Sequence, residues 1–86
     1  MSSEQKLRNS QILGRNIRAL RKEQKLTQEQ MAARLQLYGT NISRSILSQM
    51  ECGTYNVKVS ELAAMAKILK VDYNAFFKGV DIGPPE

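Results

Sequence analysis

Apolar residues recur at helical spacing along most of this chain, and little in its interior interrupts the pattern. Glycine and proline are scarce there, and no stretch shows the β-branched alternation of a strand. In the first such segment Leu13, Ile17 and Leu20 stand at positions i, i+4 and i+7, which is one face of a helix. The sequence therefore predicts an all-α fold.

Five helices are predicted from this pattern and from capping residues. The second has the clearest start, since Thr27 can cap it, Gln30 can reach back, and Leu26 and Met31 can form a hydrophobic staple. Ser43 is the expected N-cap of the third helix and Asp72 that of the fifth. The first expected helix runs from Ser10 or Gln11 to about 24, and the second from 28 to 37 or 38. The third begins at Ser43 or Arg44, the fourth covers roughly 58–70, and the short fifth covers 73–77.

The connection between the second and third helices is unusually long. Met31, Leu35 and Tyr38 share one helical stripe and Gly39 follows as a stop signal, so the second helix should continue to Leu37 or Tyr38. About five linking residues would remain. We expect Tyr38 to pack against the bundle and orient the third helix; the alternative is a flexible insertion.

The remaining core and the ends of the domain follow from the same periodicity. The fourth helix should bury Val59, Leu62, Met65, Ala66 and Leu69, and Phe76 and Phe77 should close the core. We expect a flexible N-terminal segment over 1–9, one folded domain over 10–78, and a loose tail over 79–86.

The charge is concentrated in one part of the chain. Residues 1–58 hold ten basic and four acidic residues, a balance of +6, while residues 59–86 hold three and four, a balance of −1; together they give the net +5. This asymmetry is typical of a protein with a polyanionic partner approached from one side, and equally of a small soluble protein that is basic by chance. A basic stripe on the first helix could contribute, although a solvated face explains it better; it consists of Arg15, Arg18, Lys22 and Lys25.

Composition argues against several classes of protein. No apolar run approaches the roughly 20 residues of a membrane helix, and the first ten residues are too polar for a signal peptide. With no histidine and only Cys52, neither a zinc site nor an internal disulfide is expected, and the cytoplasm is the expected compartment. The absence of an activating base and the scattered carboxylates argue against an enzyme.

The third predicted helix has one apolar and one polar face. At 100° per residue, Ile46, Leu47 and Met50 form a compact apolar arc. The opposite arc has no acidic residue, and its guanidinium, amide and hydroxyl groups are those that read base edges in DNA; it comprises Arg44, Ser45, Ser48 and Gln49. Glu51 stands at the border of the apolar arc, where it needs a cation, and Arg21 is the expected partner.

Three motifs within residues 13–77 resemble the Cro/Xre-type, lambda-repressor-like helix-turn-helix family. They are "LTQEQMA" at 26–32, the spacing S-x-x-S-x-x-E-x-G from Ser45 to Gly53, and "LAAMAKILKV" at 62–71. The chain departs from the family in having Gln36 where a glycine is usual, and in lacking the proline that usually follows the position of Gly53. Leu35 and Leu47 also stand 12 positions apart (47 − 35), against about seven in the compact motif.

The resemblance implies a compact five-helix bundle whose third helix enters the major groove while the second crosses the backbone. It implies base contacts from Arg44, Ser45, Ser48 and Gln49 and phosphate contacts from Gln28, Ser43, Asn56 and Lys58. It also pairs Arg21 with Glu51, in agreement with the helical wheel.

We therefore expect a sequence-specific double-stranded-DNA-binding transcriptional regulator, acting as a repressor and as a homodimer on a two-fold operator. Nothing in the sequence points to a cofactor, a small-molecule ligand or a membrane partner. The alternative is a protein-interaction module of the same fold, of the antitoxin or coactivator type. The salt dependence of DNA binding separates the two, because phosphate contacts release counterions.

Overall fold

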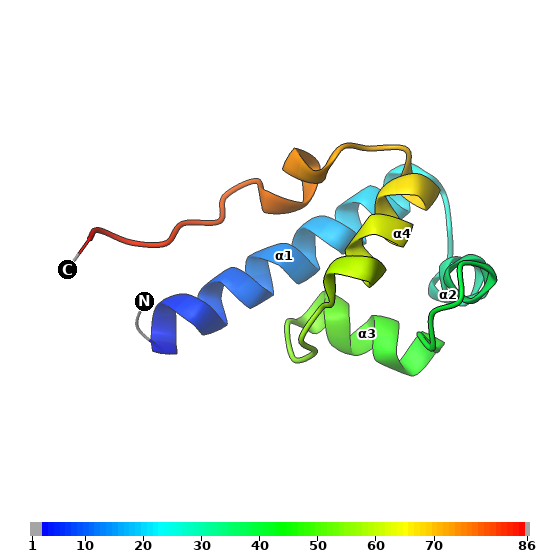
Figure 1. Cartoon of the computed structure of the whole chain (residues 1–86), viewed down its shortest axis with the longest axis horizontal. Helices are drawn as coiled ribbons and strands as arrows, with labels where there is room; N and C mark the ends of the chain where they lie inside the picture. Colours follow the sequence, from blue (N-terminus) through cyan, green and yellow to red (C-terminus); the bar gives the residue numbers. More distant parts are fainter. Residues whose placement is uncertain (1–2, 86) are drawn as a thin grey trace.

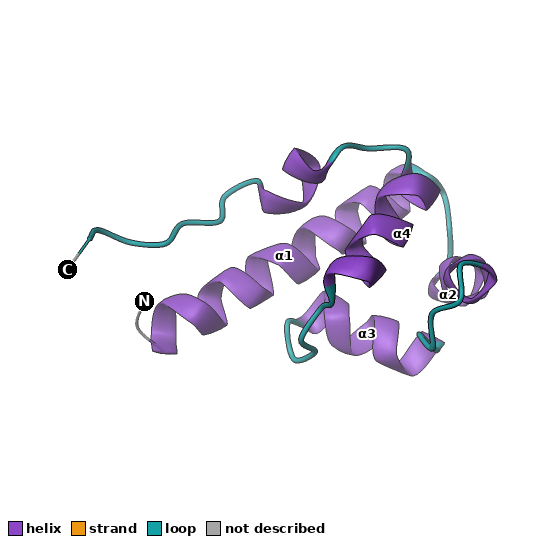
Figure 2. Ribbon diagram, viewed as in Figure 1, coloured by secondary structure: helices purple, strands orange, loops and turns teal. Residues whose placement is uncertain are grey.

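The computed structural model describes residues 3–85, which form four α-helices, one 3-10 helix and no strand (Figures 1 and 2). The all-α prediction is confirmed. The elements, in chain order, are α1 (Ser3–Glu23), α2 (Gln28–Leu37), α3 (Arg44–Cys52), α4 (Val59–Leu69) and the 3-10 helix η1 (Tyr73–Phe77). Helix α1 packs on α3 and η1, and α2 packs on α3 and α4.

The prediction of five α-helices is wrong at the fifth, which is the 3-10 helix η1. Asp72 caps it as expected, with its carboxylate accepting from the backbone N–H of Asn74 at 3.0 Å. The N–H of Ala75 donates to the carbonyl of Asp72 at 3.2 Å, an i→i+3 bond. Gly79, at φ +86°, turns the chain soon afterwards. So short a segment favours the tighter helix, which forms its bonds sooner.

Helix α1 begins at Ser3 and not at Ser10 or Gln11 as predicted. The C-terminal tail runs back beside its first turns (Figure 1). Asn9 donates to the carbonyl of Asp81 at 2.5 Å and accepts from its N–H at 3.2 Å, while Gln5 donates to the same carbonyl at 2.6 Å. These contacts lie far apart in sequence, so periodicity could not reveal them. Residues 1, 2 and 86 of the predicted terminal segments lie outside the described residues.

The core lies between the four α-helices and η1. Its fully buried side chains are Ile17, Met31, Leu35, Ile42, Leu47, Met50, Met65, Leu69 and Phe76. Val59 and Phe77, which were predicted to be buried, are exposed instead, at 85% and 46%. Helix α4 is rotated so that Glu61 faces inward, 6% exposed, and Val59 faces solvent.

The connection from α2 to α3 begins and ends where predicted, but a different side chain packs into the core. Helix α2 ends at Leu37, Gly39 takes φ +86°, and α3 begins at Arg44 with Ser43 as its N-cap. Tyr38, expected to pack against the bundle, is 55% exposed, whereas Ile42 is fully buried. The chain leaves the α-helical path after Leu37, so the stripe of α2 does not continue to Tyr38.

Hydrogen bonds link this connection to the end of α2. The hydroxyl of Thr40 donates to the carbonyl of Leu35 at 3.0 Å, and the Gln36 amide donates to the carbonyl of Ile42 at 3.1 Å. Both bonds tie the link back to the end of α2. The apolar side chain of Ile42 then sets where α3 starts.

Candidate nucleic-acid interface

Helix α3 presents the polar face that its sequence predicts. The hydroxyl of Ser43 accepts from the N–H of Ile46 at 3.2 Å and caps the helix. Leu47 and Met50 are buried, and Gly53 ends the helix at φ +80°. The four predicted base-reading residues lie on the other side: Arg44, Ser45 and Gln49 are exposed and Ser48 is partly exposed.

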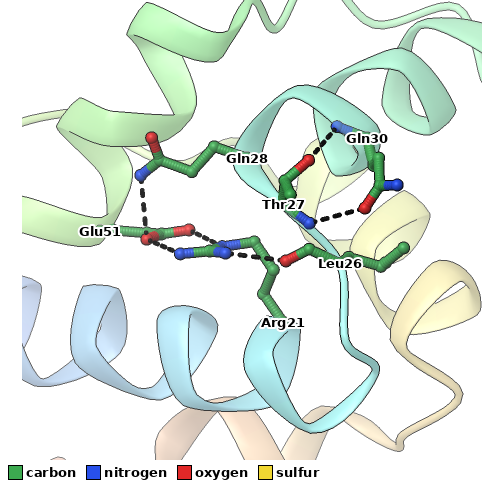
Figure 3. A network of polar contacts seen from close by, with 6 residues as sticks. All are labelled: Arg21, Leu26, Thr27, Gln28, Gln30 and Glu51. Atoms are coloured by element: carbon green, nitrogen blue, oxygen red, sulfur yellow. Dashed lines mark hydrogen bonds and ion pairs between the residues drawn. The ribbon is translucent and has the colours of Figure 1, made fainter.

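A nearly buried ion pair holds α3 against α1 (Figure 3). Arg21 donates from Nε to Oε2 of Glu51 at 2.7 Å and from Nη2 to Oε1 at 2.9 Å. The two side chains are only 9% and 4% exposed. The hydrogen bond to Glu51 raises the pKa of Arg21, outweighing the burial that lowers it. The pair expected from the helical wheel is therefore present and bidentate.

Two further groups complete this network (Figure 3). Arg21 donates from Nη1 to the carbonyl of Leu26 at 2.8 Å, which ties down the turn between α1 and α2. Gln28, the first residue of α2, donates from Nε2 to Oε1 of Glu51 at 3.2 Å. Beside it Thr27 and Gln30 form the predicted capping box, with bonds of 3.1 and 2.8 Å. The network thus fixes three helices relative to one another.

A cleft of about 700 Å³ opens over this network, between α1, the start of α2 and α3. Arg21 and Glu51, the most buried of its lining residues, form the floor. Gln28, Arg44 and Ser48 line it as well. A neighbouring hollow is lined by Gln28, Arg44, Ser45 and Ser48. The structure thus brings together three predicted base-reading residues and one predicted phosphate contact.

The other predicted contacts lie elsewhere. Lys58 borders a second hollow of about 260 Å³, which touches α3 at Ile46, on a different face of the helix from Arg44 and Ser48. Asn56 is exposed in the loop before Lys58, and Gln49 is exposed on α3 outside these hollows. Lys58 is therefore separated from the cleft that holds Gln28, Arg44 and Ser48.

Sequence reasoning missed the role of Glu61 beside Lys58. Its buried carboxylate accepts from the backbone N–H of Lys58 and from the hydroxyl of Tyr55, both at 2.8 Å. The bond to Glu61 raises the pKa of Tyr55. A glutamate three residues after the cap position is a recognisable helix-start signal. The bond from Gln28 to Glu51 was also missed, because the sequence analysis considered Gln28 only as a phosphate contact.

Over residues 3–85, no helix is both long and apolar enough to cross a membrane. Within the same residues no three histidine, cysteine or acidic side chains are grouped to hold a metal ion.

The fold and the α3 face define a helix-turn-helix protein, and sequence comparison agrees. Residues 17–76 match the model of the helix-turn-helix family. The chain belongs to the Cro/Xre-type branch of that family. It is 41% identical over 63 residues to the immunity repressor protein of Bacillus phage phi105, a match that spans 73% of this chain and 40% of that repressor. No solved structure matches the chain significantly.

Proposed function

We propose that this chain is a sequence-specific double-stranded-DNA-binding domain of a transcriptional repressor, with α3 placed in the major groove. Its family and its similarity to a phage immunity repressor support regulation of transcription and not catalysis. The observation that carries the proposal is the polar, acid-free face of α3 from Arg44 to Gln49, held in place by the buried Arg21–Glu51 pair.

The chemistry of that face suits base reading. Arg44 can donate two hydrogen bonds to guanine, and Gln49 can bond adenine through its amide. Ser45 and Ser48 can donate to or accept from either base. Because α3 is fixed against α1 and α2, these groups enter the groove already oriented, which lowers the entropy cost of binding.

Phosphate contacts are proposed on both sides of α3, as the two strands that border the major groove require. On one side Gln28 uses one amide hydrogen for Glu51 and keeps the second for a phosphate. Ser43 accepts from the backbone through its oxygen, so its hydroxyl hydrogen can still be donated. On the other side the proposed contacts are Asn56, in the loop before α4, and Lys58, the N-cap residue of α4. Both residues are exposed.

We further propose a homodimer that binds a two-fold operator in the cytoplasm. Four side chains on one short helix read few base pairs, so two copies are needed for a selective site. The matched region spans less than half of the phage repressor, so the activity of the whole protein is part of the proposal.

Selection of bound sites from a random DNA pool, followed by titration of two variants, tests this function. Arg44→Ala and Gln49→Ala should each cost about 1–3 kcal/mol on the selected site and relax preference at one position. Equal losses on selected and random DNA would show that the residues do not read bases. Failure to bind DNA at any salt concentration would favour the protein-interaction alternative.

A further inference from the structure

The structure singles out one residue of the basic stripe on the first helix. Arg15, Arg18, Lys22 and Lys25 are all exposed. Only Arg18 among them lines the cleft that also contacts Gln28, Arg44 and Ser48. It stands one turn before Arg21, whose side chain is fixed by three hydrogen bonds to Glu51 and Leu26. The backbone of α1 at Arg18 is therefore held in register with α3.

The charge around the cleft suits an anion at the rim. On the floor, the Glu51 carboxylate accepts three hydrogen bonds, two from Arg21 and one from Gln28, and its charge is offset by that of Arg21. The other charged lining residues are Arg18, Arg44 and Glu29. Two cations thus stand against one carboxylate, and the excess positive charge lies on α1 and α3.

We propose that Arg18 binds a backbone phosphate of the DNA duplex, so that α1 adds a contact beside the one made by Gln28 at the start of α2. This inference rests on the proposed function. A guanidinium can donate two parallel hydrogen bonds to phosphate oxygens, a geometry that a solvated lysine does not share. The contact carries no sequence information; it positions α3 on the duplex.

Titration of labelled operator and random duplexes at several salt concentrations tests the contact, with Arg15→Gln as the matched control. Arg18→Gln should weaken binding to both duplexes by a similar factor. Each phosphate contact contributes about 0.9 to the slope of log affinity against log salt concentration. Raising the salt from 50 to 200 mM should therefore weaken the binding of the variant by a factor about 3.5-fold smaller than for the wild type. The Arg15→Gln variant, changed on the same helix but outside the cleft, should have the affinity and salt dependence of the wild type.

Glu29 supplies a test of opposite sign, since its carboxylate lines the same cleft. Glu29→Gln should strengthen binding to both duplexes because it removes repulsion from the phosphate.

The possible failures are distinguishable. A wild-type protein without salt-dependent DNA binding overturns the proposed function and this contact with it. Normal wild-type binding with an Arg18→Gln titration that coincides with it overturns this contact alone.

Discussion

Arg21 and Glu51 lie 30 positions apart, yet two hydrogen bonds of 2.7 and 2.9 Å join the guanidinium of one to the carboxylate of the other. This pair connects α1 to the last turn of α3. Further bonds to Leu26 and Gln28 extend the connection to the start of α2. The polar network therefore helps to orient the proposed reading helix, together with the buried side chains Leu47 and Met50.

The ion pair should contribute strongly to stability. Arg21→Ala leaves the Glu51 carboxylate, 4% exposed, without its cation, which should cost on the order of 3 kcal/mol of unfolding free energy. Arg18→Ala, at an exposed position, should cost less than about 1 kcal/mol. Urea melts of both variants measure the difference, and coincident midpoints would show that the pair adds nothing.

Gly14 should resist the substitution that usually stabilises a helix. An added Cβ atom would overlap the carbonyl oxygen of Met50 and lie 2.7 Å from that of Glu51, both of them backbone atoms that cannot move aside. Gly14→Ala should therefore destabilise the protein by about 1–3 kcal/mol, despite a gain of about 1 kcal/mol in helix propensity. Arg15→Ala, at the next and exposed position, is the control and should change stability little. A more stable Gly14→Ala variant in thermal melts would mean that α1 and α3 can separate.

The link between α2 and α3 should depend on Ile42 and not on Tyr38. Ile42 is fully buried, so Ile42→Ala should cost about 2–5 kcal/mol, whereas Tyr38→Ala, at a residue 55% exposed, should cost less than about 1 kcal/mol. Amide hydrogen exchange at Ile46 and Leu47 should accelerate only in the Ile42 variant. A larger loss of stability in the Tyr38 variant than in the Ile42 variant would show that Tyr38 positions the link.

Lys58 should contribute to affinity but not to specificity. Lys58→Ala should weaken binding to operator and random DNA alike and lower the salt slope by about one unit, because one phosphate contact is lost. Lys67→Ala, at an exposed position in the last turn of α4, serves as the control. An unchanged slope in the Lys58 variant, measured by the same titrations, removes it from the interface.

Local interactions explain why much of the fold could be predicted. Thr27 and Gln30 cap α2 across three residues, and Ser43 caps α3 across the same separation. Gly39 and Gly53 take positive φ where the helices end. The polar and apolar faces of α3 likewise depend only on helical geometry, so the candidate reading face was visible in the sequence.

Contacts between distant residues decided the rest. The first turns of α1 contact the C-terminal tail through Asn9 and Asp81, which are 72 positions apart. The burial of Ile42 and Glu61 in place of Tyr38 and Val59 depends on how the helices rotate when they pack. The cleft that separates Arg18 from the other basic residues of its stripe exists only once α1, α2 and α3 meet. By itself the sequence determined the helices and the polar face of α3, because those features arise within a few residues. Only the tertiary structure decided which exposed cations share a surface with that face, because that depends on packing between helices.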